Sequence, residues 1–430
     1  MRRFFAFQER NTSYKQETIA GITTFLSMAY ILIVNPAILS QAGMDKGAVF
    51  TATALTAIIG TLIIGLFANY PVVIAPSMGL NSFFTFTVCQ AMGIPWEIAL
   101  TGVFVSGVLF LLLSLLKIRE MIINMIPQDL KHAIAAGIGF FIAFIGLKNA
   151  GIITANGGTI IGLGDLATPE ALLALFGFGV TYLLFVRGVN GGIFLGMGIA
   201  TIAGIATGVI EKPASFIGSI PSLKPTFGVV FSHLHELWTP EIFAVIFTFL
   251  FVAFFDTAGA LIAVASQAGL VKDNKIPNAG RALVSDSAAT IIGSILGTST
   301  TATMIESNAG IAAGGRTGFT SLITAALIFL SMFFSPVLSA ITGEITAAAL
   351  MIVGALMATE VKKINWKNPE IVIPCFMTIL MMPLSSSVAT GIAAGFILYP
   401  IGMIVAGKGR DVHPVMYILF LAFLAYFLYM

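Results

Sequence analysis

The chain has 430 residues, of which 58% are hydrophobic and only 9% are charged, and its mean hydropathy is +1.01. Soluble domains carry about 25% charged residues, so this composition excludes an ordinary soluble protein and predicts a polytopic membrane protein. The net charge of +2 excludes a nucleic-acid-binding surface, and the two cysteines, Cys89 and Cys375, lie in apolar segments and form no disulfide framework. No cleavable signal peptide is evident, so the first span is expected to target the chain.

Apolar segments of roughly membrane-spanning length follow one another along the chain. Seven are predicted in the first half, at 18–39, 48–68, 72–92, 96–116, 130–151, 170–187 and 191–210. Seven more are predicted in the second half, at 241–268, 279–297, 298–313, 318–336, 341–359, 368–383 and 386–406. The connection 211–240 joins the halves, and its run 234–238 predicts an interfacial helix. The final apolar piece, 414–430, is short enough either to span the membrane or to lie on it.

The basic residues favour fourteen spans with a cytoplasmic N-terminus, because cytoplasmic loops are enriched in Lys and Arg. In that topology only four of the 21 basic residues lie outside, namely Lys46, Lys148, Lys212 and Lys224. An odd number of spans in each half inverts the second half. We therefore predict an all-α polytopic membrane protein of two inverted seven-span repeats, an arrangement that places substrate near the bilayer midplane. The alternative is an accidental likeness among Gly/Ala-rich spans.

The third span of each half contains a polar interruption. In the first, Pro76 ends a helix after the β-branched run 72–74, which favours a short extended piece. Ser77 can then cap a half-helix. In the second, the Ser and Thr residues of 298–303 precede a helix that contains Glu306. Non-helical backbone at membrane depth is tolerated only inside protein or beside a watery cavity, so we expect the two breaks to meet at a substrate site.

The first half-helix carries Gly79, Leu80 and Asn81. The start of a half-helix offers free N–H groups, and the Asn81 amide can both donate and accept hydrogen bonds. Such a set, together with carboxylates, suits the edge of a neutral heterocycle. The alternative is that Pro76 and Gly79 only kink a packing helix.

Three acidic residues, Asp256, Asp286 and Glu306, lie inside predicted spans. A charge at mid-membrane costs about 2.5–3.5 kcal/mol on insertion scales, so each needs a reason. Asp256 and Glu306 are predicted to line the substrate cavity, and one of them is expected to carry a proton. A purely structural, hydrogen-bonded carboxylate is the alternative, and it is favoured for Asp286, which lies near the end of its span. No metal-ligand cluster, catalytic nucleophile motif or phosphate-binding loop is present, so neither an enzyme nor a cofactor is expected.

Four segments together resemble the AzgA-like purine permeases of the nucleobase–cation symporter and nucleobase–ascorbate transporter superfamily. They are 75–84 (APSMGLNSFF), 255–259 (FDTAG), 297–301 (GTSTT) and 305–318 (IESNAGIAAGGRTG). The resemblance runs from about Glu9 to the C-terminus, although the family usually has Gly where Ser77 stands. It implies import of hypoxanthine, guanine or adenine with protons across the plasma membrane, by a transporter with a core and a gate.

By motif, the resemblance implies that the purine is bound by Asn81, Asp256 and Glu306, and that Glu306 or Asp256 couples the proton. It further implies flanking contacts from Gly79, Leu80, Thr303 and Ser307, and from Thr24, Phe25 and Met28 in span one.

The implied domains follow the spans. A cytoplasmic N-terminus (1–17) precedes the core segments 18–116 and 241–336, the gate segments are 117–210 and 337–406, the connection is 211–240, and the C-terminal segment is 407–430. A uracil or xanthine symporter stays open, as does an anion exchanger of the same plan, although two carboxylates in the site would repel an anion. A homodimer is an open expectation, and the sequence does not rank the purines.

Overall fold

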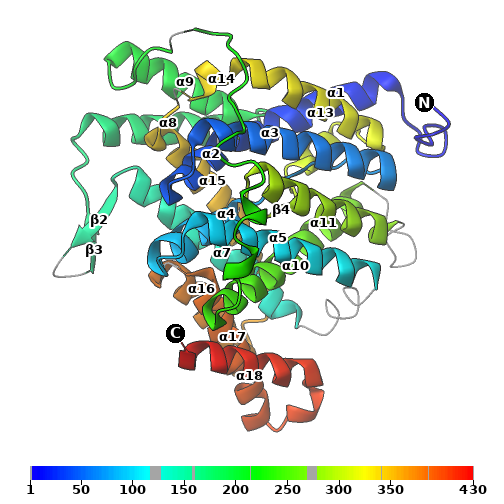
Figure 1. Ribbon diagram of the computed structural model, residues 1–430, viewed down its shortest axis with the longest axis vertical. Coiled ribbons are helices and arrows are strands. Elements are labelled where there is room, and N and C mark those ends of the chain that lie inside the picture. Colours follow the sequence, from blue (N-terminus) through cyan, green and yellow to red (C-terminus); the bar gives the residue numbers. More distant parts are fainter. Residues whose placement is uncertain are drawn as a thin grey trace.

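The computed structural model describes residues 2–116, 127–156, 160–213, 215–268, 278–339, 341–385 and 387–429. Most of these residues are helical (Figure 1). Within them, seven helices are long and apolar enough to cross a membrane, and three more apolar helices are shorter. The first of the seven is a single kinked unit, in which α1 and α2 are separated by Ala29 and Tyr30.

The first half begins with helices that surround the first break. Their bounds are α1 Tyr14–Met28, α2 Ile31–Leu39, η1 Ser40–Ala42, α3 Lys46–Ile63, the π-helix η2 Ile64–Ala68, β1 Ile74–Pro76, α4 Met78–Ser82, the π-helix η3 Phe83–Ala91 and α5 Trp96–Leu115. The rest of this half consists of α7 Gln128–Asn149, β2 Ile153–Asn156, β3 Ile160–Leu163, α8 Pro169–Val186 and α9 Gly192–Thr207.

The second half repeats much of this order. Its core-side elements are α10 Pro240–Gln267, α11 Ala279–Leu296, β4 Thr301–Thr303, α12 Ser307–Ala312, α13 Gly318–Ser331, η6 Met332–Phe334 and α14 Ser335–Ser339. They are followed by α15 Gly343–Ala358, η7 Thr359–Lys363, α16 Pro369–Leu384, α17 Val388–Val405, η8 Gly409–Asp411 and α18 Pro414–Tyr429. The helix α18 packs against α17 (Figure 1).

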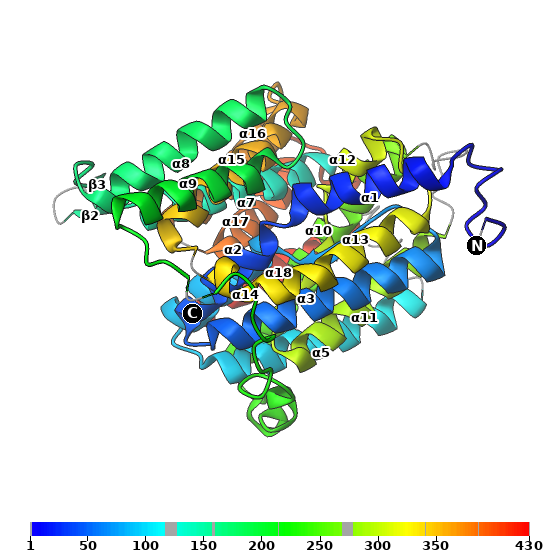
Figure 2. The same ribbon diagram turned by 90° about the horizontal axis from the view of Figure 1, so that it is seen from above.

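The helices form two groups that lie on opposite sides of the molecule (Figure 2). In one group α1 and α3 pack against α13, and α5 and α3 pack against α11, with α10 beside α5. In the other group α7 packs against α15 and α16, α8 against α9, and α16 against α17. Small residues permit a close crossing of α7 and α15: a Cβ on Gly139 of α7 would lie 2.7 Å from the Gly354 oxygen of α15.

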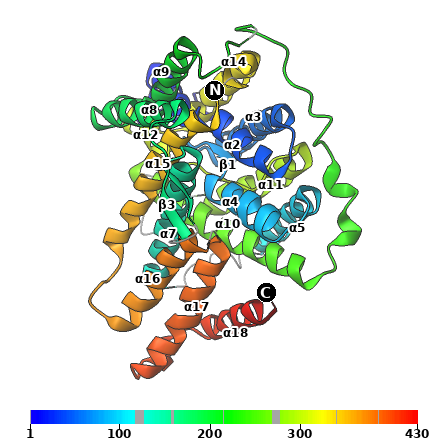
Figure 3. The ribbon, with the colours of Figure 1, turned by 90° about the vertical axis from the view of Figure 1, so that its left-hand side faces the viewer.

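The connection between the halves differs from the interfacial helix that the sequence predicts. Its described part contains only the short 3-10 turns η4 Val229–Phe231 and η5 Leu234–Glu236, and it runs along the outside of the molecule (Figure 3). Three prolines at 213, 221 and 225 remove backbone donors and prevent a continuous helix in the first part of the connection. The later run 234–238 forms only η5, which packs against α5. Thr226 holds the connection to the end of α11, because its Oγ1 donates to the Leu296 carbonyl at 2.9 Å.

A second difference from the sequence analysis is a small hairpin between α7 and α8. The strands β2 and β3 pair antiparallel, with Ile153 opposite Leu163 and Asn156 opposite Ile160. The β-branched residues Ile153, Thr154, Ile160 and Ile161 suit this conformation, but no structure was predicted for them from the sequence.

Candidate functional site

The two interrupted segments lie side by side near the middle of the molecule, where they form a two-stranded antiparallel sheet (Figures 1 and 3). Ile74 is opposite Thr303, and Pro76 is opposite Thr301. The backbone N–H of Ser77 donates to the Thr300 carbonyl at 2.9 Å, and that of Met304 donates to the Val73 carbonyl, also at 2.9 Å. Each buried strand thereby satisfies the other's backbone groups, as non-helical chain away from water requires.

Each strand leads directly into a short helix. The first, α4, begins one residue after Ser77 and continues as the π-helix η3. The second, α12, begins at Ser307, immediately after Glu306. The helix α10, which carries Asp256, packs against β4, α12 and α4. The two breaks and α10 therefore meet in one region of the fold.

Asn81 is fully buried in α4 and belongs to a polar network. Its amide nitrogen donates to Oδ1 of Asn35, a buried residue of α2. Asn35 in turn donates from Nδ2 to Thr53 Oγ1 at 2.7 Å and to Thr298 Oγ1 at 2.9 Å. Asn35 was not predicted as a site residue from the sequence. An asparagine in the middle of the apolar run 31–39 was the available signal, because such a group needs hydrogen-bond partners.

Glu306 occupies the corresponding place beside the second break. Its Oε1 accepts a hydrogen bond from the Tyr30 hydroxyl. Tyr30 is fully buried between α1 and α2, whereas Glu306 is partly exposed. Span one thus contacts both breaks, through Tyr30 on one side and Asn35 on the other. Tyr30 was also missed, since one of eight tyrosines gave no pattern in the sequence.

The residues expected to flank the site have different environments. The Thr303 hydroxyl is buried and has no hydrogen bond within the described residues, so it is available to a ligand. Ser307 is engaged with the protein, because its Oγ accepts from the Val73 N–H at 3.0 Å. Gly79 faces the other helix group, since a Cβ there would lie 2.6 Å from Ile138 Cγ2 of α7. Leu80 is fully buried in the hydrophobic core.

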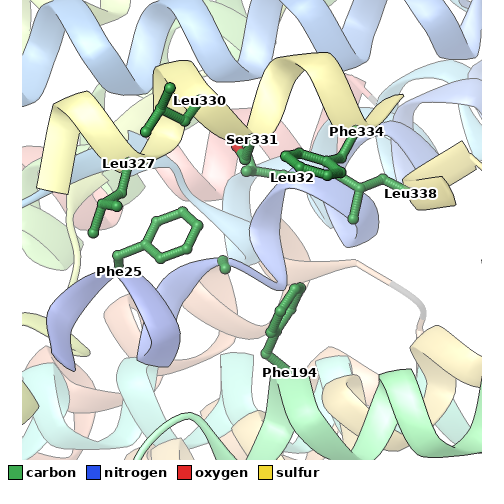
Figure 4. A pocket seen from close by; sticks show the side chains of 9 residues that line it. Phe25, Leu32, Phe194, Leu327, Leu330, Ser331, Phe334 and Leu338 are labelled. Carbon is green, nitrogen blue, oxygen red and sulfur yellow. The ribbon is translucent and has the colours of Figure 1, made fainter. Parts of the chain in front are cut away.

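The three candidate binding residues of span one lie in different surroundings. Thr24 is buried against α12, where a Cβ on Gly310 would lie 1.9 Å from its Oγ1. Met28 is fully buried in the core. Phe25 instead lines a cleft of about 260 Å³, together with apolar residues of α2, α9, α13 and α14 (Figure 4). This cleft contains neither Asn81 nor Glu306 among its lining residues, so the structure does not bring Phe25 together with them.

The acidic residues of the second half also have different surroundings. Asp256 lies on α10, but its side chain is outside the described part of the structure. Asp286 of α11 is fully buried, and its Oδ2 accepts from Thr257 Oγ1 at 2.7 Å. Its backbone oxygen also accepts from Thr301 Oγ1 of β4 at 3.2 Å. Asp286 therefore joins α11 to the helix that carries Asp256, which agrees with the structural role that its position favours.

A further buried carboxylate, Glu17, was absent from the sequence prediction because it lies at the edge of the first span. It is fully buried in the first turn of α1 and binds the start of α13. Its oxygens accept from the backbone N–H groups of Arg316, Thr317 and Thr320 at 3.0–3.2 Å, and from the Thr320 hydroxyl at 2.6 Å. The Thr12 hydroxyl adds a fifth bond at 2.8 Å. The Gly-Gly-Arg-Thr-Gly sequence after α12 thus serves as a binding loop for Glu17.

Residues 15–394 match the model of a family described as the permease family. The chain belongs to this family. The guanine/hypoxanthine permease PbuG of Bacillus subtilis (strain 168) is 52% identical to this permease over the full length of both chains. The adenine permease AdeP of Escherichia coli (strain K12) is 40% identical, with 99% of this chain and 95% of AdeP covered. The permease is therefore an integral membrane protein of a transport family rather than a family of enzymes.

Solved structures with the same fold are more distant in sequence. The transmembrane domain of a cyanobacterium bicarbonate transporter, BicA, matches with a TM-score of 0.62 at 17% identity, covering 91% of this chain and 97% of that chain. SLC26A9 matches with a TM-score of 0.64 at 11% identity, covering 91% of this chain and 65% of that chain. At these identities the likeness concerns the fold alone.

Proposed function

We propose that this permease imports purine nucleobases, namely hypoxanthine, guanine or adenine, together with protons across the plasma membrane. The single observation that carries the proposal is the pairing of the two breaks, which puts Asn81 beside one strand and Glu306 beside the other. A neutral amide and a carboxylate can accept and donate along the edge of a purine. The relatives named for guanine, hypoxanthine and adenine transport support the same substrate class.

We further propose that the chain crosses the membrane fourteen times, with a cytoplasmic N-terminus, as two inverted seven-span repeats. The helix packing supports this symmetry. Contacts of α1 with α13 have their counterpart in α10 with α5, and contacts of α8 with α9 have theirs in α16 with α17. The central pairs α3 with α11 and α7 with α15 each join equivalent elements of the two halves.

In this proposal, transport occurs by alternating access, in which the core segments (18–116 and 241–336) move against the gate segments (117–210 and 337–406). The site lies on the core side, and Gly79 meets Ile138 of the gate across their boundary. A small residue there lets α4 approach α7 closely and slide past it. Replacement by a larger residue is expected to block the movement.

The proton is assigned to Glu306, with Asp256 as a second candidate. Of these two carboxylates only Glu306 has a described side chain; it is partly exposed and accepts a hydrogen bond from the buried Tyr30 hydroxyl. One proton crossing 100 mV supplies about 2.3 kcal/mol, which corresponds to roughly 1.6 decades of accumulation.

The test is uptake of labelled hypoxanthine, guanine and adenine into proteoliposomes, with and without an inward proton gradient. Uracil, xanthine and bicarbonate serve as competitors that represent the alternative substrates. Glu306→Gln is expected to abolish gradient-driven accumulation, and Asp256→Ala to abolish binding. Glu211→Gln, at an exposed position of the connection, is the matched control. Wild-type accumulation by both site variants would refute the site assignment, and competition by bicarbonate alone would refute the substrate class.

A further inference from the structure

Three fully buried polar side chains, Thr53, Asn35 and Asn81, form a continuous hydrogen-bonded chain from α3 through α2 to α4. Its starting point is the Thr53 hydroxyl, which donates to the Val49 carbonyl one turn earlier in α3 at 2.6 Å. A hydroxyl has a single proton to donate. Thr53 Oγ1 can therefore only accept from Asn35, whose amide nitrogen lies 2.7 Å away.

The orientation of Asn35 follows from this constraint. Its Nδ2 must face Thr53, and the second proton of the same group is donated to Thr298 Oγ1 at 2.9 Å. Both amide protons are then used, and Oδ1 faces the opposite way, toward α4. There it can only accept, so Asn81 must present its own Nδ2 to Asn35.

Asn81 is thereby oriented as well. With Nδ2 directed to Asn35, its Oδ1 points away from this network, and this buried oxygen has no hydrogen bond within the described residues. A turned-over Asn81 would place two amide oxygens against each other and would leave its donors unpaired. Leaving a buried polar group unsatisfied costs about 1–3 kcal/mol, so the observed orientation is strongly preferred.

We propose that Thr53 and Asn35 are positioning residues that set the hydrogen-bond polarity of the substrate site, by holding Asn81 as an acceptor. The site then selects heterocycles that present an N–H group at this point and disfavours those that present a ring nitrogen lone pair. This inference rests on the proposed function, and it narrows the double role expected for Asn81 from the sequence. Sites that recognise a polar group reject analogues that cannot make the hydrogen bond.

Thr53→Val tests the inference, because it keeps the shape of the side chain but removes the acceptor. Asn35 can then turn over, with the Thr298 hydroxyl donating to its Oδ1 instead of accepting from its Nδ2. Asn35 then donates to Asn81, so that Asn81 presents its NH₂ group to the substrate. The matched control is Thr56→Val, since Thr56 lies on the same helix, is fully buried, and makes no hydrogen bond through its hydroxyl within the described residues. Thr53→Ser keeps the hydroxyl and is the rescue variant.

The measurement is a set of inhibition constants against labelled hypoxanthine uptake in proteoliposomes. The inhibitors are hypoxanthine, adenine, 7-deazahypoxanthine and 9-deazahypoxanthine, which exchange donors, acceptors and C–H groups around the purine edges with little change in size. Thr53→Val is expected to change the ratio between at least two of these constants by about tenfold, the equivalent of one hydrogen bond of 1.4 kcal/mol. Thr56→Val and Thr53→Ser are expected to keep the wild-type ratios.

A uniform change of all four constants in Thr53→Val, or no change, would overturn the inference, since a merely structural role does not alter their ratios. If Thr53→Val does not yield folded protein, Asn35→Leu replaces it, because it frees the Asn81 amide to turn. Asn35→Leu is expected to bring the four inhibition constants closer together, and wild-type ratios in this variant would overturn the inference equally. A wild-type protein that takes up no purine would instead refute the proposed function.

Discussion

The hydrogen bonds around Glu17 offer the sharpest test of how α1 is held to the start of α13. Five hydrogen bonds converge on this carboxylate, and three of them come from backbone N–H groups around the start of α13. Two of these N–H groups, those of Arg316 and Thr317, precede the first residue of α13, and the third, that of Thr320, also reaches the Thr317 carbonyl at 3.2 Å. Glu17→Ala removes the acceptor for all of them.

The magnitude follows from these bonds. A hydrogen bond to a charged group contributes about 1.5–3 kcal/mol, so five independent bonds would exceed the destabilisation of nearly every single substitution. They are not independent, because they share two oxygen atoms and the Thr320 N–H keeps its bond to the Thr317 carbonyl. We expect a loss of about 3–5 kcal/mol for Glu17→Ala, the upper range for point substitutions. Glu17→Gln keeps one acceptor oxygen but places an NH₂ group against N–H donors, so about 2 kcal/mol is expected.

The assay is thermal unfolding of the purified permease in detergent, followed by the loss of the monodisperse gel-filtration peak. The expected order of melting temperatures is wild type, then Glu17→Gln, then Glu17→Ala. Glu9→Gln is the matched control, because Glu9 is exposed in the same N-terminal segment, and it should melt with the wild type. If Glu17→Ala also melts with the wild type, the hydrogen bonds do not stabilise the fold and the reasoning fails.

Two further substitutions probe the packing of the breaks. Gly310→Ala places a methyl group 1.9 Å from Thr24 Oγ1 and 2.6 Å from the Ala20 carbonyl, so α12 must move away from α1. We expect the free energy of unfolding to fall by about 1–3 kcal/mol and purine uptake to be reduced. Thermal unfolding and the transport assay measure the two effects. Gly179→Ala, where nothing lies within 4 Å, is its control, and equal behaviour of the two would contradict the packing. Ser321→Ala removes a hydroxyl that accepts from the Val72 N–H at 3.0 Å and lies within hydrogen-bond distance of the Tyr70 and Val72 carbonyls, at 2.7 and 2.8 Å. We expect the free energy of unfolding to fall by about 1–2 kcal/mol in the thermal unfolding assay. The same melting temperature as the wild type would show that Ser321 does not stabilise the segment before β1.

Much of the architecture could be predicted because membrane solvation restricts the possibilities. Apolar runs of spanning length predict helices, and Pro76 and the Ser/Thr cluster 298–303 mark where helices cannot continue. The connection 211–240 was predicted less well. The run 234–238 suits an interfacial helix by composition, yet the structure forms only the 3-10 turn η5 there, and this turn packs against α5.

The residues of the candidate site were likewise predicted only in part. Asn81 and Glu306 stand out in the sequence because polar groups within apolar spans are costly. Tyr30 and Asn35, their direct partners, do not stand out as a pair, because their roles depend on the kink that brings span one past both breaks. Phe25 and Thr24 are neighbours in sequence, but successive residues of a helix point to different faces. The structure therefore puts Thr24 against α12 and Phe25 in the cleft.

The sequence by itself determined that this is a membrane protein, that its spans are interrupted at two matched places, and which polar residues lie at the interruptions. These features depend on composition and local spacing, which act through solvation and backbone chemistry. Only the tertiary structure decided that the interruptions pair as strands, that Glu17 closes the start of α13, and that Thr53 and Asn35 fix the direction of the Asn81 amide. Hydrogen-bond direction depends on which groups far apart in the chain face one another, and no local pattern in the sequence records that.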